Sequence, residues 1–145
     1  MDCALLGLSV DSLYAHIGWI RAIHEQFGVA VPFPIIEDPS MAIGRAYGML
    51  DESASDSSAI RASYFIDPDG VIRALTWYPA AVGRSIKEML RLVAGLQRTA
   101  AGDVMTPEGW SPGGNVMLPP SEEASAALSE ENADWFCRTR PDHSP

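Results

Sequence analysis

The sequence contains few cysteines. Cys3 and Cys137 are the two cysteines among its 145 residues. Two cysteines are too few for the several disulfide bonds that hold a small secreted protein together, and no Cys/His spacing resembles a zinc site. We therefore expect no metal centre and no disulfide framework, and we expect a reducing, cytoplasmic location.

Positive charge is also scarce. The chain has ten Lys and Arg residues against 19 Asp and Glu residues, which gives a formal net charge of −9. A surface that binds nucleic acid or an anionic membrane needs a basic field that displaces counterions. The composition therefore argues against a nucleic-acid partner and against a membrane partner.

Long hydrophobic runs are missing as well. No run approaches the roughly 18 apolar residues that cross a membrane. Asp2 stands where a signal peptide carries a basic residue. With 47% hydrophobic residues over 145 positions, the chain is long enough for one domain with a sizeable core.

The first part of the sequence predicts a strand, a helix and a second strand. The apolar run Ala4–Val10 predicts a buried strand, and Asp11–Ser12 offers side-chain oxygens that cap a following helix. Apolar residues at helical spacing predict that helix over Leu13–Phe27, with Gly28 as its end. Val31–Glu37 is expected to be an edge strand, because its two prolines cannot donate to a ladder.

The middle of the chain predicts a short helix, a polar loop and a hairpin. The helix opens at residues 38–40 and runs through Tyr47, and residues 51–58 form the loop. Ala62–Ile66 and Val71–Tyr78 are the hairpin arms, joined by the tight turn 67–70, which contains Pro and Gly. The order of the elements favours an α/β fold with helices on both faces of one sheet.

The last part of the chain predicts one helix followed by an extended arm. An apolar stripe runs along Ser85–Ala100. After Gly102, repeated Pro and Gly residues disfavour regular elements. Glu122–Glu131 is expected to be a short acidic helix, and a polar tail follows the apolar Trp135–Cys137.

An ordered set of short motifs resembles the peroxiredoxins, in particular the one-cysteine subgroup and its archaeal and bacterial relatives. The set comprises Leu8–Ser12, His16, Trp19, Pro32–Ile36, Arg61, Tyr64–Asp67, Tyr78–Pro79, Gly83–Arg84, Thr106–Pro107, Trp110 and Val116–Met117. The resemblance implies a thioredoxin-like fold, incomplete at its N-terminus, over residues 1–100. It implies a C-terminal peroxiredoxin arm and polar tail over residues 101–145.

The resemblance also implies an activity and its partners. A peroxiredoxin reduces hydrogen peroxide or an alkyl hydroperoxide with a cysteine thiolate, and a thiol reductant such as thioredoxin restores the enzyme. No cofactor is implied. A homodimer or a higher homo-oligomer is implied by the resemblance alone.

The peroxidatic cysteine of that family has no counterpart in this sequence. The family carries it in a Pro-x-x-x-Thr/Ser-x-x-Cys motif at a helix N-terminus, and neither Cys3 nor Cys137 fits that spacing. The resemblance places this motif before the strand at Ala4–Val10, together with a central strand of the sheet. We therefore expect that the chain begins after the reaction centre and is inactive alone.

Three residues are candidates for the site. Arg61 matches the family arginine that binds the thiolate and the peroxide, although a surface arginine at a strand start would look the same. Arg84 matches a second arginine that supports the site in the family. The alternative interpretation is that Arg84 is an ordinary residue in the first turn of a helix. Cys137 is either a resolving cysteine, as in some relatives, or a small hydrophobic residue.

Two other functions stay open at this stage. The missing nucleophile favours a catalytically empty thioredoxin-like module that binds a partner or dimerises. A decayed gene product without function is the third reading. Translation of the genomic DNA upstream of Met1 distinguishes a misassigned start codon from a true truncation.

Overall fold

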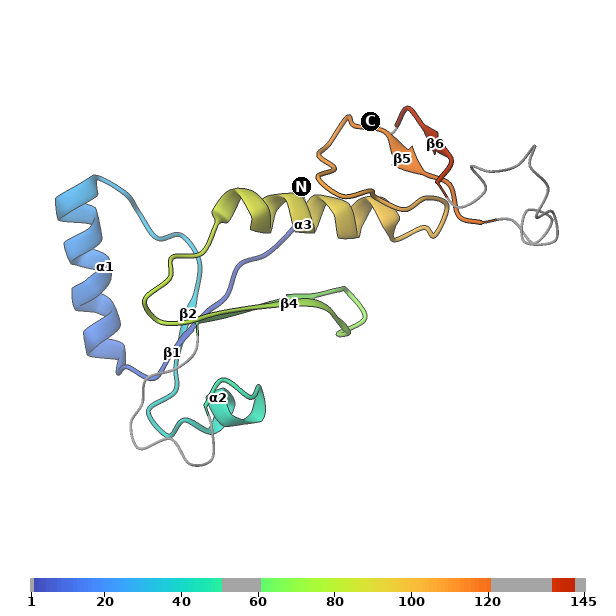
Figure 1. The fold of residues 1–145 in the computed structure, drawn as a ribbon. Coiled ribbons are helices and arrows are strands. Elements are labelled where there is room, and N and C mark those ends of the chain that lie inside the picture. Colours follow the sequence, from blue (N-terminus) through green and yellow to red (C-terminus); the bar gives the residue numbers. More distant parts are fainter. Residues whose placement is uncertain (1, 51–60, 121–136, 143–145) are drawn as a thin grey trace. The chain divides into compact units, whose positions relative to one another are not determined.

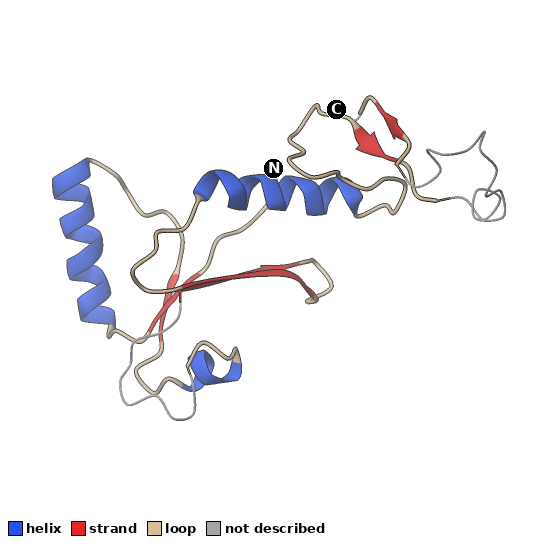
Figure 2. Cartoon of the chain, viewed as in Figure 1, coloured by secondary structure: helices blue, strands red, loops and turns tan. Residues whose placement is uncertain are grey.

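The structure is a computed structural model that describes residues 2–50, 61–120 and 137–142. The chain divides into two compact units, Met1–Arg84 and Ser85–Pro145. The first unit contains α1, α2 and β1 to β4, and the second contains α3, β5 and β6. Figure 1 follows the elements along the chain, and Figure 2 separates helices from strands.

Helix α1 covers Leu13–Phe27, as the apolar spacing predicts. The Ser12 side chain accepts a hydrogen bond from the Ala15 N–H at 3.4 Å, which satisfies one of the free amides of the first turn. Gly28 ends the helix with φ 67°, a left-handed conformation that glycine adopts without a steric cost. Local signals therefore determine both ends of α1.

Strands β1 (Gly7–Ser9) and β2 (Ile35–Glu37) form a parallel pair, with Leu8 opposite Ile36. The expected strands Ala4–Val10 and Val31–Glu37 are both too long. Strand β1 has no second partner in the described part of the chain, so the residues before Gly7 lie outside any ladder. At β2 the prolines before Ile35 cannot donate, and the ladder begins only where Gly7 donates to the Pro34 carbonyl at 2.9 Å.

Helix α2 is limited to Ala42–Ala46, so the expected start at residues 38–40 is too early. Met41 has φ 59°, a left-handed conformation that separates it from the helix. Asp38 acts from outside the helix, since its carboxylate accepts from the Gly44 N–H at 2.7 Å. These residues thus form an Asp-stabilised turn ahead of α2.

Strands β3 (Arg61–Ile66) and β4 (Ile72–Tyr78) form the expected antiparallel hairpin. The Asp67 carboxylate accepts from the N–H groups of Asp69 and Val71 and from the Arg73 guanidinium. The Val71 N–H, and then the Arg73 guanidinium, hold the pKa of Asp67 below its usual range. The ionised Asp67 therefore stabilises the turn, and beyond it the ladder shifts register between Phe65 and Ile66.

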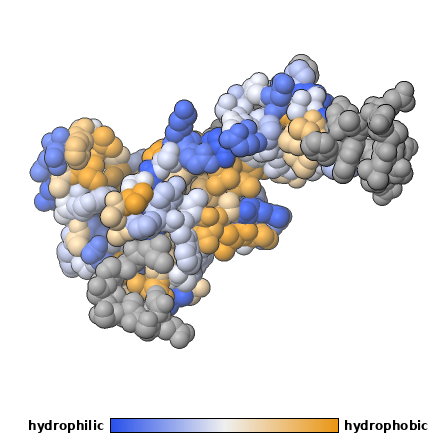
Figure 3. Space-filling view, viewed as in Figure 1, coloured by the Kyte–Doolittle hydropathy of each residue, from blue (hydrophilic) through white to orange (hydrophobic). Residues whose placement is uncertain are grey.

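The described residues contain three separate two-stranded sheets rather than the single sheet expected from the order of elements. The β1–β2 pair and the β3–β4 hairpin each keep an open edge in the part of the chain described. The peroxiredoxin resemblance places a further strand between them, and no described segment lies there. Large apolar side chains on α1 and the hairpin are exposed, among them Ile17, Leu75 and Trp77. Figure 3 shows hydrophobic patches, in orange, on the surface of the molecule.

The second unit packs around a tryptophan. Helix α3 (Ile86–Thr99) begins at the Ser85 cap, and Trp110 lies with Val104 and Val116 in a buried cluster. The indole lies against α3 at Gly95, where a Cβ would be in ordinary van der Waals contact with the ring at 3.9 Å.

A short antiparallel pair follows this cluster, made of β5 (Val116–Met117) and β6 (Thr139–Arg140). The sequence predicts no strand after Gly102. The pair escapes prediction because each strand has only two residues and its partner is distant in the chain. The loop expected at residues 51–58 and the helix expected at Glu122–Glu131 lie outside the described residues.

We expect replacement of Trp110 by Ala to lower the free energy of unfolding by about 3–5 kcal/mol, because it empties the centre of this cluster. The matched control is Trp19→Ala on α1, because Trp19 is 58% exposed whereas Trp110 is 5% exposed. The control should change stability by less than about 1 kcal/mol. Chemical denaturation measures both, and equal losses would contradict the assignment of the core.

Candidate functional site

The register of the hairpin places polar side chains of β3 and β4 on one face. Arg61 lies opposite Tyr78, and Ser63 lies opposite Thr76. Since side chains alternate along a strand, Arg61 and Ser63 point to the same side of the sheet. This face lies at the end of the hairpin away from the turn at Asp67.

Arg61 is the first residue of β3 and is exposed. Its Nε donates a hydrogen bond to the Ala80 carbonyl at 3.0 Å, which ties it to the segment that follows β4. Among the described residues, this bond uses one of the five guanidinium N–H donors and leaves the terminal nitrogens for another partner. The backbone bond thus orients the side chain without neutralising its charge.

Arg84 reaches the same part of the hairpin from the segment before α3. Its Nη1 donates to the Ala62 carbonyl and to the Ser63 Oγ, each at 3.2 Å. Across the ladder, the Thr76 Oγ1 is buried and has no hydrogen-bond partner among the described residues. We call Arg61, Ser63, Thr76 and Arg84 the hairpin arginine face.

The two arginines of this face differ electrostatically from others in the chain. Arg73, Arg91, Arg98 and Arg140 each form an ion pair with an Asp or Glu. Within the residues that the structure describes, Arg61 and Arg84 form none. Arg21, Arg45 and Arg138 form none there either, and what distinguishes Arg61 and Arg84 is that both lie at one end of the hairpin. Two guanidinium groups on one face are suited to an anion or a developing negative charge.

The sequence-predicted residues separate into the two units. Arg61 and Arg84 come together on the hairpin arginine face, whereas Cys137 belongs to the second unit, where it precedes β6. Cys3 and Cys137 are both exposed free thiols. Sequence reasoning missed Ser63 and Thr76, although the alternation of β3 and β4 could have placed both beside Arg61.

Two motif residues of α1 behave differently from each other. His16 is buried, and neither of its ring nitrogens has a partner in the described ranges. Trp19 is largely exposed, so packing of α1 accounts for the position of His16 and not for that of Trp19. On the other side of the hairpin, the Tyr64 hydroxyl donates to the Tyr47 carbonyl and the two rings meet edge to face.

The structure adds two negative findings for its described part. No helix there is both long and apolar enough to span a bilayer. No group of three or more His, Cys, Asp or Glu residues there could hold a metal ion.

Comparison with protein families gives two matches along the chain. The AhpC/TSA family matches residues 1–75, and the C-terminal domain of 1-Cys peroxiredoxin matches residues 95–131. A peroxiredoxin of Methanosarcina mazei is 37% identical over 98% of this chain and 71% of its own length. Peroxiredoxin 2 of Picrophilus torridus is 39% identical over 96% of this chain and 70% of its own length.

Solved structures of peroxiredoxins are also similar to this chain. A cysteine-to-serine mutant of peroxiredoxin 6 from Arenicola marina superposes with a TM-score of 0.73 at 33% identity, over 90% of this chain and 60% of that chain. A yeast mitochondrial 1-Cys peroxiredoxin superposes with a TM-score of 0.74 at 34% identity, over 90% and 62%. The chain thus spans less than two thirds of these two solved structures.

The hairpin arginine face should bind a small oxyanion. We expect methanesulfinate to shift the NMR signals of Arg61 and Arg84, and Arg61→Met or Arg84→Met to weaken binding roughly tenfold through loss of charged hydrogen bonds. Arg73→Met is the matched control, because Arg73 is already paired with Asp67 on the same hairpin. Equal affinity in all three variants would contradict an anion site on this face.

Proposed function

The chain belongs to the peroxiredoxin family, with a thioredoxin-like fold, and we propose that it supplies the arginine side of a thiol peroxidase site. The substrates would be hydrogen peroxide and alkyl hydroperoxides. The observation that carries the proposal is the hairpin arginine face, on which Arg61 and Arg84 lie without a carboxylate partner among the described residues.

The reaction needs donors at the place where charge develops. A cysteine thiolate attacks one peroxide oxygen, the O–O bond breaks, and sulfur becomes a sulfenic acid while the leaving oxygen takes up a proton. The forked N–H groups of a guanidinium can hold sulfur and oxygen together and stabilise the charge on the leaving oxygen. We assign this role to Arg61.

Arg84 has a supporting role in this proposal. Its bonds to the Ala62 carbonyl and the Ser63 hydroxyl hold β3 at the two residues that directly follow Arg61. The second charge also raises the local potential for a thiolate or an alkoxide. Arg84 thus supports Arg61 by position and by charge.

The nucleophile would come from residues outside this sequence, because neither Cys3 nor Cys137 stands in the family motif. Cys137 would be a resolving cysteine, whose thiol attacks the sulfenic sulfur, forms a disulfide and releases water. Its exposure supports access by a second sulfur. A thiol reductant such as thioredoxin would then reduce the disulfide, in a cytoplasmic homodimer or higher homo-oligomer without nucleic-acid or membrane partners.

A second candidate function is a catalytically empty thioredoxin-like module that binds a partner or dimerises. The exposed apolar side chains of the hairpin, such as Leu75 and Trp77, favour it. An open sheet edge beside such residues promotes association with another chain. The location of Arg61 and Arg84 at the same part of the hairpin favours the peroxidase proposal, because a purely associating surface has no need of two adjacent cations.

We expect the 145-residue chain to consume peroxide no faster than buffer when dithiothreitol or thioredoxin is supplied, because it lacks the nucleophile motif. Peroxide consumption followed with a colorimetric peroxide assay measures this. Cys3→Ser and Cys137→Ser are the control variants.

Turnover that either substitution abolishes would overturn the view that the nucleophile lies elsewhere. In-frame translation of the DNA upstream of Met1 distinguishes the two candidate functions. A Pro-x-x-x-Thr/Ser-x-x-Cys segment there supports the peroxidase, and a stop codon directly before Met1 supports the empty module.

A further inference from the structure

The C-terminal residues 137–142, here called the C-terminal strap, lie on the second unit without apolar anchoring. Cys137, Thr139, Arg140 and Pro141 are all exposed. The strap pairs with β5 over two positions, and the Leu118 N–H donates to the Arg138 carbonyl at 2.8 Å. So short a ladder is a weak attachment on its own.

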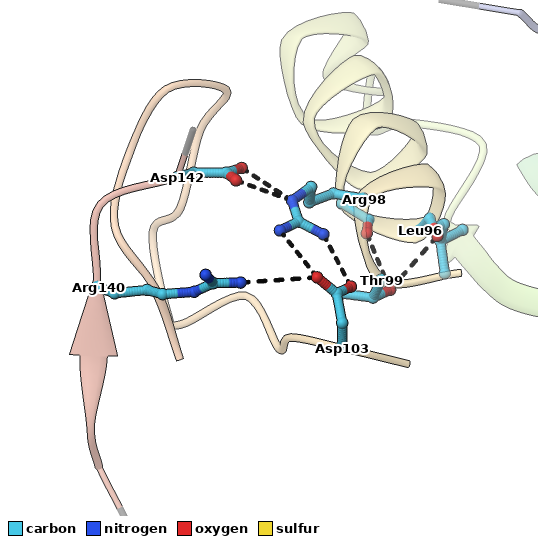
Figure 4. Close-up of polar contacts among 7 residues, drawn as sticks. Leu96, Arg98, Thr99, Asp103, Arg140 and Asp142 are labelled. Atoms are coloured by element: carbon cyan, nitrogen blue, oxygen red, sulfur yellow. Dashed lines mark hydrogen bonds and ion pairs between the residues drawn. The ribbon is translucent and has the colours of Figure 1, made fainter. Parts of the chain in front are cut away.

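Arg98 forms the main side-chain attachment of the strap (Figure 4). Its Nε donates to both carboxylate oxygens of Asp142 at 3.0 and 2.9 Å, and its Nη1 donates to Asp103 at 3.0 Å. Arg140 of the strap lies 3.7 Å from the same Asp103. Arg98 therefore joins α3, the loop after it and the strap.

Burial makes the loss of one partner of this contact more costly than in a surface ion pair. The side chains of Arg98 and Asp142 are only 14% and 6% exposed, whereas that of Asp103 is 47% exposed. Arg98 also lies in the last turn of α3, where the free carbonyls favour a cation. Removal of one charge would leave a partly buried partner uncompensated.

The groups around Arg98 show how the contact responds to solution conditions. The strap contributes Asp142, Arg140 and Arg138, whose buried Nε has no partner in the described segments, and the loop contributes Asp103. The bonds from Arg98 hold the pKa of Asp103 below its usual range, so its charge persists near neutral pH. Salt screens a buried pair only weakly, so the direct means of weakening the contact is to remove one of its two charged groups.

We propose that the C-terminal strap is a detachable segment that Arg98 holds to α3 by charge, so that loss of the Arg98–Asp142 pair releases it while the rest of the second unit stays folded. Release would expose one edge of β5. The other edge stays covered, because Met117 and Met105 exchange both backbone hydrogen bonds at 2.8 Å.

These two edges give an internal test by NMR hydrogen exchange on the full chain. The Leu118 amide is held by the strap and the Met117 amide by Met105, one residue apart. In Arg98→Met and in Asp142→Asn, Leu118 should exchange roughly tenfold faster or more, and Met117 should keep its rate.

Arg73→Met, which removes an ion pair in the first unit, should change neither amide. Unchanged exchange of Leu118 in both variants would overturn the proposal. Equal acceleration of hydrogen exchange at Leu118 and Met117 in the milder Asp142→Asn variant would also overturn it. The Arg98–Asp142 ion pair would then stabilise the whole second unit. The outcome does not depend on the peroxidase proposal.

Discussion

The antiparallel register of β3 on β4 is the constraint on which the candidate site depends. It places Arg61 opposite Tyr78 and Ser63 opposite Thr76, so that the guanidinium and the hydroxyl share a face that Arg84 can reach. A slip of one residue would turn Arg61 to the opposite face of the sheet. The Asp67 turn closes the hairpin, and a register shift between Phe65 and Ile66 separates that turn from the regular ladder that carries Arg61.

The fold could be predicted where its signals are local. Capping by Ser12 and Gly28 indicated the bounds of α1, and the turn sequence indicated the hairpin. Lengths of β1 and β2 could not be predicted, because a strand ends where its partner ends and not where its apolar run ends. The β5–β6 pair joins residues more than 20 positions apart, and no local pattern indicates it.

The site could be predicted only in part. Resemblance singled out Arg61 and Arg84, but the residue types alone gave no reason to prefer them to other arginines. The bond from Arg84 to Ser63 spans 21 residues, and the bond from Arg98 to Asp142 spans 44. Such contacts depend on how separate elements pack, and a single sequence carries no pairing signal for them.

The most direct test of the account is chemical modification of arginine, mapped by mass spectrometry. The account predicts that phenylglyoxal modifies Arg61 and Arg84 and that methanesulfinate protects both. The exposed Arg21 of α1 should be modified at the same rate with or without the anion. Modification of Arg61 and Arg84 that the anion leaves unchanged would contradict the claim that these two cations form one anion-binding face.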